Sequence, residues 1–307
     1  MAQKRMKDWI DFGLVRDFAA EETEAYRLCT RPDGWVERYG PDLLVSYKTE
    51  KGRQETLAAL EEWALLGNQK FARIFGRHLP KQNAERHPPQ LISGEASAPL
   101  QRTVLERGVC FGLDFGAGYS AGLFIDQREN RRFVRQASPR RLLNCFAYTC
   151  SFSVMAALAG AETLSIDLSR KSLERGRDNF MLNKLATDRH RFLADDVLDV
   201  LPRLARRGER FDCIVLDPPT FSRSRTGRSW QVERDFENLL LAALEVAERD
   251  AKILLATNCT RLDERALEVM GRFCLKATRH GGRFLPATPL PDFPRGAAAR
   301  SLWMILR

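Results

Sequence analysis

Four carboxylates stand at the ends of short apolar runs in the second half of the chain. Asp167 ends one run, Asp195 and Asp196 end the next, and Asp217 ends "FDCIVLD" directly before two prolines. Ligands of open α/β sheets bind beyond the carboxyl ends of the strands, so these acids can reach one common ligand. Asp167 lies about 20 residues after an earlier strand-like run, where a carboxylate can accept both hydroxyl groups of a ribose. The alternative for Asp167 taken alone, which is less favoured, is a solvated acid that caps the next helix.

The turn after the first of these strands, residues 146–153, contains no glycine. A turn that holds a pyrophosphate would need glycine for close backbone approach. The glycine-rich "GAGYSAG" at 116–122 does not replace it, because its spacing is wrong and it opens no helix; it predicts a hairpin turn between two strands. The sequence therefore disfavours NAD and nucleoside triphosphates. It favours a ligand with ribose and adenine but no phosphate, with Asp196 orienting the adenine amino group.

The elements that must position these acids alternate between strands and helices. Strands are expected at 141–148, 161–169, 190–197, 211–219 and 251–259, and helices at 151–160, 169–185 (capped by Ser169), 198–206 and 232–248. This alternation predicts a doubly wound α/β domain. In the last helix, one face collects the apolar side chains that would cover the sheet: Val232, Phe236, Leu239, Leu240 and Ala243.

The first part of the chain has a different texture. Two strands are expected around a turn at residues 40–42, followed by a helix at 54–66 and a polar, proline-bearing linker or long surface loop at 76–99. Residues 107–132 are expected to form a strand, a glycine-rich turn and a second strand, and the carboxyl end a loop and a final edge strand. The predicted organisation is a small α+β domain at 1–95, a linker and β-hairpin at 96–134, and the α/β domain at 135–307.

Composition limits the partners and the metal chemistry. The net charge of +9 and the pI of about 9.4 make an anionic partner plausible. Seven scattered cysteines without a C-x-x-C pair, together with four histidines, argue against a zinc site or a disulfide framework. No run of about 18 apolar residues and no signal-like start are seen, so a cytoplasmic location without membrane contact is expected.

Five segments together resemble one enzyme family. "LNCFAYTCSFSVMAALAGA", "LSIDLSRKSLERGRDNFMLNKL", "LADDV" and "IVLDPPTFS" occur in this order, and "AGLFIDQRENRR" precedes them. They are similar to the S-adenosylmethionine (SAM)-dependent methyltransferases that modify bacterial 23S ribosomal RNA. The resemblance covers roughly residues 107–259. It implies a Rossmann-like methyltransferase sheet, SAM as cofactor, and RNA as partner, with the region before residue 100 as a candidate RNA platform.

The resemblance also implies roles for individual residues. Phe146, Tyr148 and Thr149 would approach the methionine part of SAM, while Asp167 would hold the ribose and Asp196 the adenine. Around them, the cofactor would be closed in by a lead-in segment and by the acid that faces the base: Asp126, Gln127, Arg128 (near the SAM carboxylate) and Asp217. Relatives usually have glycine near Cys150 and Ser151, where this chain has side chains.

The same resemblance places the target base beyond Asp217. Pro218 and Pro219 would keep that loop rigid, which lowers the entropy lost when the base docks. Phe221 and Trp230 are candidates for stacking a flipped base, although a place in the core is the favoured interpretation of each aromatic taken separately. Phosphate contacts are expected from Arg223, Arg225 and Arg228 and from the six arginines at 128–141.

Two chemistries of the family compete. For cytosine C5, a thiolate attacks C6 and makes C5 nucleophilic, and Cys259 stands where that branch has its nucleophile. Cys259 can also be a small apolar filler. For guanine N7, a lone pair already exists and only positioning is needed; "DPPTFS" followed by "VERD" fits that branch similarly well. Cytosine C5 is the leading prediction, with Asp217 and Cys259 as catalytic residues. A catalytically inactive RNA-binding protein and an enzyme acting on a small molecule or a protein are the alternatives.

Overall fold

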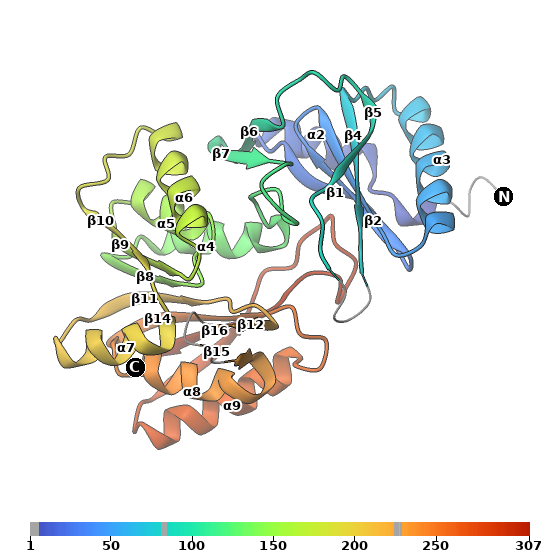
Figure 1. Ribbon diagram of the computed structural model, residues 1–307. Coiled ribbons are helices and arrows are strands. Elements are labelled where there is room, and N and C mark those ends of the chain that lie inside the picture. The colour runs from blue at the N-terminus through green and yellow to red at the C-terminus, as the bar shows by residue number, and fades with distance from the viewer. Residues whose placement is uncertain (1–5, 81–84, 224–226, 228) are drawn as a thin grey trace. The chain divides into compact units, whose positions relative to one another are not determined.

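The chain forms two compact units in this computed structural model, which describes all residues except 1–5, 81–84, 224–226 and 228 (Figure 1). The first unit comprises Met1–Ile125 and Leu290–Ala297, and the second comprises Asp126–Pro289 and Ala298–Arg307. The late segment belongs to the first unit because Asp292 Oδ2 accepts the N–H of Arg27 at 2.8 Å. The ring of Phe293 also lies 4.1 Å from the Arg27 guanidinium carbon.

The first unit contains a five-stranded sheet with a helix packed on it. The strands lie side by side in chain order: β1 (Ala25–Arg31), β2 (Gly34–Tyr39), β3 (Asp42–Tyr47), β4 (Arg73–His78) and β5 (Gln90–Gly94). The helices are η1 (Met6–Asp8), α2 (Phe12–Ala20) and α3 (Glu50–Leu66). Trp63 of α3 is fully buried and stacks on Trp9 with 5.2 Å between ring centroids. The two strands and the helix expected between residues 34 and 66 are therefore confirmed.

Two expectations for this region are wrong. The linker predicted at 76–99 contains β5, which pairs antiparallel with β4. The strand predicted after the glycine-rich turn is absent from the described residues, since Asp114 donates its N–H to the Ala121 carbonyl at 2.7 Å and closes a loop. The hairpin comes earlier, between β6 (Gln101–Glu106) and β7 (Val109–Asp114).

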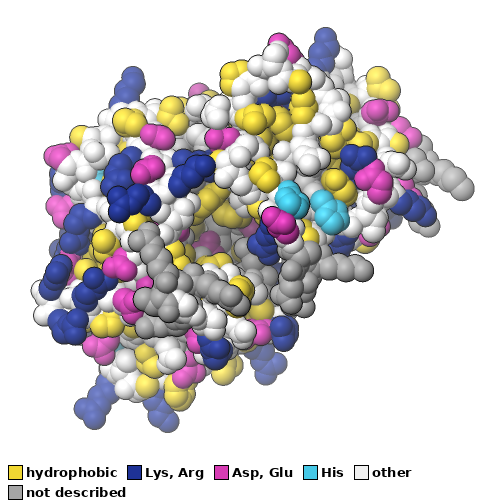
Figure 2. Space-filling model, viewed as in Figure 1, with side chains coloured by type: hydrophobic (Ala, Val, Ile, Leu, Met, Phe, Trp, Pro, Cys, Tyr) yellow, Lys and Arg dark blue, Asp and Glu magenta, His cyan; other side chains and the backbone are white. Residues whose placement is uncertain are grey.

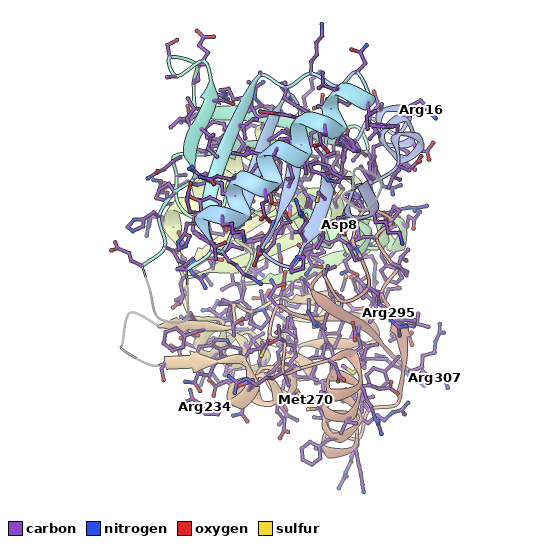
Figure 3. All side chains as sticks on the ribbon, turned by 90° about the vertical axis from the view of Figure 1, so that its right-hand side faces the viewer. Asp8, Arg16, Arg234, Met270, Arg295 and Arg307 are labelled. Atoms are coloured by element: carbon purple, nitrogen blue, oxygen red, sulfur yellow. The ribbon has the colours of Figure 1, made fainter. Side chains whose placement is uncertain are left out.

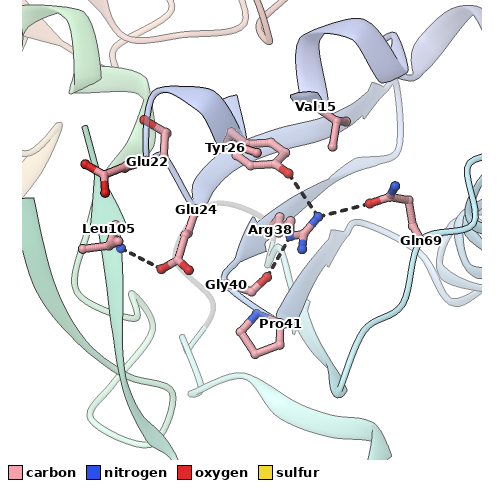
Figure 4. A pocket seen from close by; sticks show the side chains of 11 residues that line it. Val15, Glu22, Glu24, Tyr26, Arg38, Gly40, Pro41, Gln69 and Leu105 are labelled. Atoms are coloured by element: carbon pink, nitrogen blue, oxygen red, sulfur yellow. Dashed lines mark hydrogen bonds between the residues drawn. The ribbon is translucent and has the colours of Figure 1, made fainter. Parts of the chain in front are cut away.

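A cavity of about 610 Å³ lies within the first unit (Figure 4). Arg38 crosses its wall and donates to the Tyr26 hydroxyl at 3.1 Å, to Gln69 Oε1 at 3.2 Å and to the Gly40 carbonyl at 2.7 Å. Glu24 accepts the N–H of Leu105 at 2.9 Å. The polar groups of this cavity are thus bonded to its own walls, and it contains none of the residues expected to bind SAM.

The second unit is a seven-stranded mixed sheet with helices on both faces (Figure 1). Its order is β10 (His190–Ala194), β9 (Glu162–Asp167), β8 (Arg141–Cys145), β11 (Phe211–Leu216), β14 (Ala247–Thr257), β16 (Arg300–Leu306) and β15 (Gly282–Pro286). β16 runs antiparallel to both of its neighbours. The doubly wound α/β fold is confirmed, but the last strand is not at the edge. β15, which sequence reasoning missed, occupies that place.

Alternation along the strands separates the two faces of this sheet. Cys213 and Val215 of β11 face a core shared with α4 (Arg128–Ala137) and α5 (Ser151–Leu158). Ile214 and Leu216 face a larger core shared with three other helices: α7 (Val197–Arg206), α8 (Val232–Leu244) and α9 (Glu264–Ala277). In Figure 3, Arg234 on α8 and Met270 on α9 mark this second face. The apolar face predicted for α8 is buried there, as expected.

The glycine-free turn after β8 adopts a conformation that glycine would favour. Phe146, Tyr148 and Cys150 have φ values of 58°, 48° and 59°, all in the left-handed region. Each such residue costs on the order of 1 kcal/mol or more unless its surroundings enforce it. Two side chains hold the turn: Asp167 accepts the N–H of Tyr148 at 2.8 Å, and Asn179 donates to the Thr149 carbonyl at 2.8 Å.

The space for the Cys150 side chain comes from a glycine in another helix, α6 (Arg170–Leu182). A Cβ built on Gly176 would lie 2.4 Å from Cys150 Sγ and 3.0 Å from its Cβ. A cysteine at position 150, near which the resemblance leads one to expect glycine, is therefore compatible with the fold because residue 176 has no side chain.

We expect Gly176→Ala to lower the free energy of unfolding by about 1–3 kcal/mol, because the new methyl group overlaps a buried thiol. In Cys150→Gly/Gly176→Ala the overlap is gone, so the double variant should be more stable than the sum of the two single changes predicts. Urea unfolding of the four proteins measures this coupling. Additive effects would show that the two residues do not constrain each other.

Candidate active site

Three strand ends and their acids lie at one edge of the second unit's sheet. Asp167 pairs with Ala194, the last residue of β10, and Cys145 at the end of β8 pairs with Leu216 of β11. Phe146 and Asp217 each follow directly after those residues. The topology therefore brings the turn after β8 and the acids of β9, β10 and β11 to neighbouring positions.

Asp167 connects three backbone segments at this edge. Its Oδ2 accepts the N–H of Tyr148 and its Oδ1 that of Ser169, both at 2.8 Å. Its carbonyl accepts the N–H of Asp195 at 3.1 Å. Burial raises the pKa of Asp167, and the two backbone hydrogen bonds oppose that shift. The carboxylate thus orders the turn and the start of α6.

Asp196 caps α7, since its Oδ1 accepts the N–H of Leu198 at 3.0 Å. It also lines a small cavity of about 80 Å³ beside the strand ends. Apolar side chains form much of its wall. Polar groups come from the hairpin of β12 (Phe221–Arg223) and β13 (Ser229–Gln231) and from α8. The lining residues are Phe146, Leu168, Asp196, Val197, Leu198, Ser222, Ser229, Trp230, Arg234 and Asp235. Asp196 therefore both caps α7 and lines the cavity.

Asp217 is partly buried and accepts a hydrogen bond on one oxygen. Gln127 Nε2 donates to its Oδ2 at 3.1 Å. Burial and the nearby charge of Asp126 raise the pKa of Asp217 to about 7, while Arg131 and the Gln127 bond oppose the rise. Asp217 is therefore poised to change protonation near neutral pH, as acids and bases of active sites often are.

The lead-in residues lie in the second unit, at the start of α4. Asp126 is in η2 (Ile125–Gln127), and its Oδ2 accepts the N–H of Ala299 at 3.2 Å. Arg128 is 1% exposed. Arg131 is as deeply buried as Arg128, so two of the six arginines expected to contact phosphates face the interior.

The remaining arginines of that run lie closer to the surface, but acids accompany several of them. Arg140 pairs with Glu248, and Arg141 lies 3.1 Å from Glu209. Figure 2 shows Lys and Arg side chains with Asp and Glu interspersed among them. The expectation of one arginine-rich phosphate surface at 128–141 is therefore wrong for its buried members.

The loop after β11 separates its two aromatic candidates. Trp230 is 6% exposed, and its ring centroid lies 5.6 Å from that of Phe146. Its indole N–H donates to the Pro219 carbonyl at 2.8 Å. Phe221 is 52% exposed. Pro218 is buried and Pro219 is exposed. Trp230 is thus a core residue that braces the loop, whereas stacking by the exposed Phe221 stays a prediction. The Arg223 side chain, Arg225 and Arg228 lie outside the described part of the chain.

Cys259 and Asp217 point to helices on opposite faces of the sheet. Cys259 is 4% exposed, belongs to the core shared with α7, α8 and α9, and donates its thiol to Glu233 Oε1 of α8 at 3.3 Å. Asp217 instead contacts Gln127, beside α4. Glu233 also lies 2.7 Å from Arg261. The role of Cys259 as a nucleophile stays a prediction.

Some residues of this edge were not found from the sequence. Asn130 and Trp303 connect to Asp217 through Gln127, and Arg234 and Asp235 line the cavity. The motif "VERD" contains Arg234 and Asp235 but gives no sign that they reach the cavity. In the described part of the chain, no group of three or more His, Cys, Asp or Glu side chains could hold a metal ion. Among the same residues, no helix is both long and apolar enough to cross a membrane.

Comparison with known proteins decides the family. The family model described as "S-adenosylmethionine-dependent methyltransferase" matches residues 38–262. The chain belongs to the SAM-dependent methyltransferase family. SAM is accordingly its methyl donor, as the resemblance of the motifs predicted.

Several relatives match at moderate identity. Ribosomal RNA large subunit methyltransferase I of Tolumonas auensis is 32% identical over 290 residues, which cover 89% of this chain and 71% of the relative. Ribosomal RNA large subunit methyltransferase K/L of Colwellia psychrerythraea is 38% identical over 288 residues, covering 88% and 38%. YwbD of Bacillus subtilis is 32% identical over 203 residues, covering 63% and 51%. The chain thus spans about half the length of YwbD and less of the K/L enzyme.

Solved structures show the same fold. A SAM-dependent methyltransferase from Agrobacterium tumefaciens superposes with a TM-score of 0.69 at 20% identity, over 93% of this chain and 90% of that one. At this identity the likeness concerns the fold alone.

The residues at the sheet edge fit SAM. Adenine needs a flat apolar slot with a polar group at its rim, and the cavity beside Asp196 combines Phe146, Leu168 and Val197 with that carboxylate. A ribose needs hydrogen-bond acceptors, and the Asp167 carboxylate retains lone pairs beyond those that accept backbone N–H groups. No glycine-rich phosphate cradle is needed, since SAM carries no phosphate.

The raised pKa of Asp217 makes stability depend on pH. The folded protein binds this proton more tightly than the unfolded chain does, so the associated stability is present below about pH 4 and is lost as pH rises through about 7. Asp217→Asn removes the titration. We expect its free energy of unfolding to exceed that of the wild type by about 2 kcal/mol at pH 8 and to match it near pH 4.5.

Urea unfolding at the two pH values measures this difference in the free energy of unfolding. Groups other than residue 217 titrate in both proteins, so their effects cancel when the variant is compared with the wild type. A gap between variant and wild type that is the same at pH 4.5 and pH 8 would contradict the assignment.

Proposed function

We propose that the chain transfers a methyl group from SAM to a base of large-subunit ribosomal RNA. The observation that carries the proposal is Asp217, a partly buried acid beside the cofactor edge with one oxygen held by Gln127. Two relatives bear the name ribosomal RNA large subunit methyltransferase, and the net charge of +9 suits a polyanion. Ribosomal RNA is a cytoplasmic substrate, so the proposal includes the expected cytoplasmic location.

The parts of the site have distinct tasks in this proposal. Bound SAM supplies an electrophilic methyl group on its sulfonium. Asp167 and the turn around Tyr148 orient the ribose and methionine ends of the cofactor, and Asp196 orients the adenine. Asp217 accepts a hydrogen bond from an amino or imino group of the target base. The rigid Pro218–Pro219 step limits the entropy that docking removes.

We favour guanine N7 as the acceptor atom. N7 carries a lone pair in the plane of the ring and needs no activation, so an enzyme must only position it against the methyl group. The contacts of Cys259 support this route: its thiol is 4% exposed and directed at Glu233 of α8, whereas Asp217 is directed toward Gln127. A covalent route would need the thiol to turn from one side of the sheet edge to the other.

Cytosine C5 is the second candidate, supported by one specific contact. Glu233 Oε1 lies 3.3 Å from Cys259 Sγ and can accept the thiol proton. The thiolate would then add to C6, the electron pair released at C5 would take the methyl group, and loss of the C5 proton would expel the thiolate.

Nucleoside mass spectrometry distinguishes these reactions. Ribosomal RNA from a strain lacking the gene would be incubated with the protein and methyl-labelled SAM, then digested. We expect labelled 7-methylguanosine, at least half of wild-type activity in Cys259→Ala, and a loss of about 100-fold or more in Asp217→Asn. Cys274→Ala, which removes another buried thiol on the same face of the sheet, controls for effects on folding.

Labelled 5-methylcytidine that disappears in Cys259→Ala but not in the control Cys274→Ala would replace the N7 assignment with the covalent route. No label in any nucleoside, from a protein that binds SAM, would contradict ribosomal RNA as the substrate.

A further inference from the structure

A chain of three hydrogen bonds ends on the catalytic carboxylate. Trp303 Nε1 of β16 donates to Asn130 Oδ1 at 3.0 Å, Asn130 Nδ2 donates to Gln127 Oε1 at 2.7 Å, and Gln127 Nε2 donates to Asp217 Oδ2 at 3.1 Å. The three donors are 1%, 4% and 2% exposed. The chain joins residues 173 and 90 positions apart in the sequence, so it exists only in the folded unit.

The indole fixes the direction of the whole chain. An indole N–H can only donate, whereas an amide can present either its oxygen or its NH₂ group. Trp303 therefore obliges Asn130 to turn its oxygen toward the indole and its NH₂ toward Gln127. Gln127 must then turn its own oxygen toward Asn130 and its NH₂ toward Asp217. Within the described part of the chain, these three side chains make no other hydrogen bond that could decide the orientation differently.

Packing holds the Trp303 ring in the orientation that directs its N–H toward Asn130. Trp303 lies in the core shared with α4 and α5, and its ring is 4.2 Å from that of Phe133. Asn130 and Gln127 are three residues apart at the start of α4, so they lie on one face of the helix. The donor held this way contacts Oδ2 of Asp217.

We propose that Trp303 and Asn130 are positioning residues, which act through Gln127 to keep Oδ2 of Asp217 an acceptor and to leave Oδ1 as the atom that meets the target base. The part that concerns the base rests on the proposed function. Any proton that Asp217 takes up then resides on Oδ1. The acid consequently presents to the base either an acceptor or an O–H donor, while its other oxygen stays fixed.

The chain of hydrogen bonds also affects the pKa of Asp217, because the bond from Gln127 favours the ionised carboxylate. Burial and Asp126 raise the pKa of Asp217, and Arg131 and Gln127 oppose them. If the indole N–H is removed, the amide of Asn130 can reverse, and Gln127 can then turn its oxygen toward Asp217. A carbonyl oxygen beside a carboxylate disfavours the charged form, so the pKa of Asp217 should rise further.

The test uses Trp303→Phe, which keeps an aromatic ring, and Asn130→Leu, which keeps a similar volume. Trp63→Phe is the matched control: it removes another buried indole N–H, which donates to the Ile10 carbonyl at 3.3 Å in the first unit. The Asp217 carboxyl would be titrated by ¹³C NMR in the SAM-free protein labelled at aspartate, with its resonance identified by its loss in Asp217→Asn.

We expect the pKa of Asp217 to rise by about 0.5–1 in both test variants and to stay unchanged in the control. Titration curves that coincide with the wild type in both test variants would overturn the proposal. If one of them fails to fold in urea titrations, the other decides by the same criterion.

Methyl transfer provides the second readout. A positioning role predicts about a tenfold lower kcat with a pH profile displaced in the same direction, and an unchanged KM for SAM. A raised pKa in a protein that methylates no RNA would support the positioning role and contradict the proposed function. An unchanged pKa with RNA methylation intact would contradict the positioning role alone.

Discussion

The carboxylate of Asp167 accepting two backbone N–H groups is the interaction on which the site depends. It holds the N–H of Tyr148 in a turn where three non-glycine residues adopt left-handed backbone angles, and it holds the N–H of Ser169 where α6 begins. An unpaired N–H at either place would cost about 1–3 kcal/mol if buried. Asn179 and Gly176 complete the support from α6. The edge of the sheet where the acids gather is thus held in place by contacts within the chain itself.

The division of the sheet into two faces separates the two chemistries that the motifs left open. Asp217 belongs to the side where α4 and η2 supply amides and charges, and Cys259 belongs to the side where α8 supplies Glu233. A strand alternates its side chains between faces, so two residues at neighbouring strand ends need not meet. This separation favours methyl transfer to guanine N7, which needs only a correctly positioned base, over the cytosine-C5 route, which needs a covalent bond between the base and Cys259.

The sequence was sufficient for the α/β fold and for the edge of the sheet where the acids gather. Alternating apolar periods predicted β8, β9, β10, β11 and β14 and the helices between them, because those patterns are local; the short strands β12 and β13 were not predicted. The antiparallel β16 was expected at the sheet edge, since nothing in its sequence reports which neighbours it pairs with. The hairpin was expected around the glycine-rich segment, whereas a bond between Asp114 and Ala121 makes that segment a loop.

The site was predictable only where function acts through single residues at strand ends. The direction of the Cys259 side chain and the burial of Arg128 follow from packing between distant segments. The hydrogen bond from Trp303 to Asn130 spans 173 residues, and the fit of Cys150 against Gly176 depends on two helices meeting. Neither relation leaves a local pattern in the sequence.

Calorimetric titration of SAM into the wild type, Asp167→Asn and Asp178→Asn would show whether Asp167 organises the cofactor site. Asp167→Asn replaces one acceptor by an NH₂ group that faces a backbone N–H, whereas Asp178 is an exposed acid of α6. We expect one SAM site in the wild type, affinity at least about tenfold weaker in Asp167→Asn, and no change in Asp178→Asn. Equal affinity in all three proteins would contradict the claim that Asp167 organises the cofactor site.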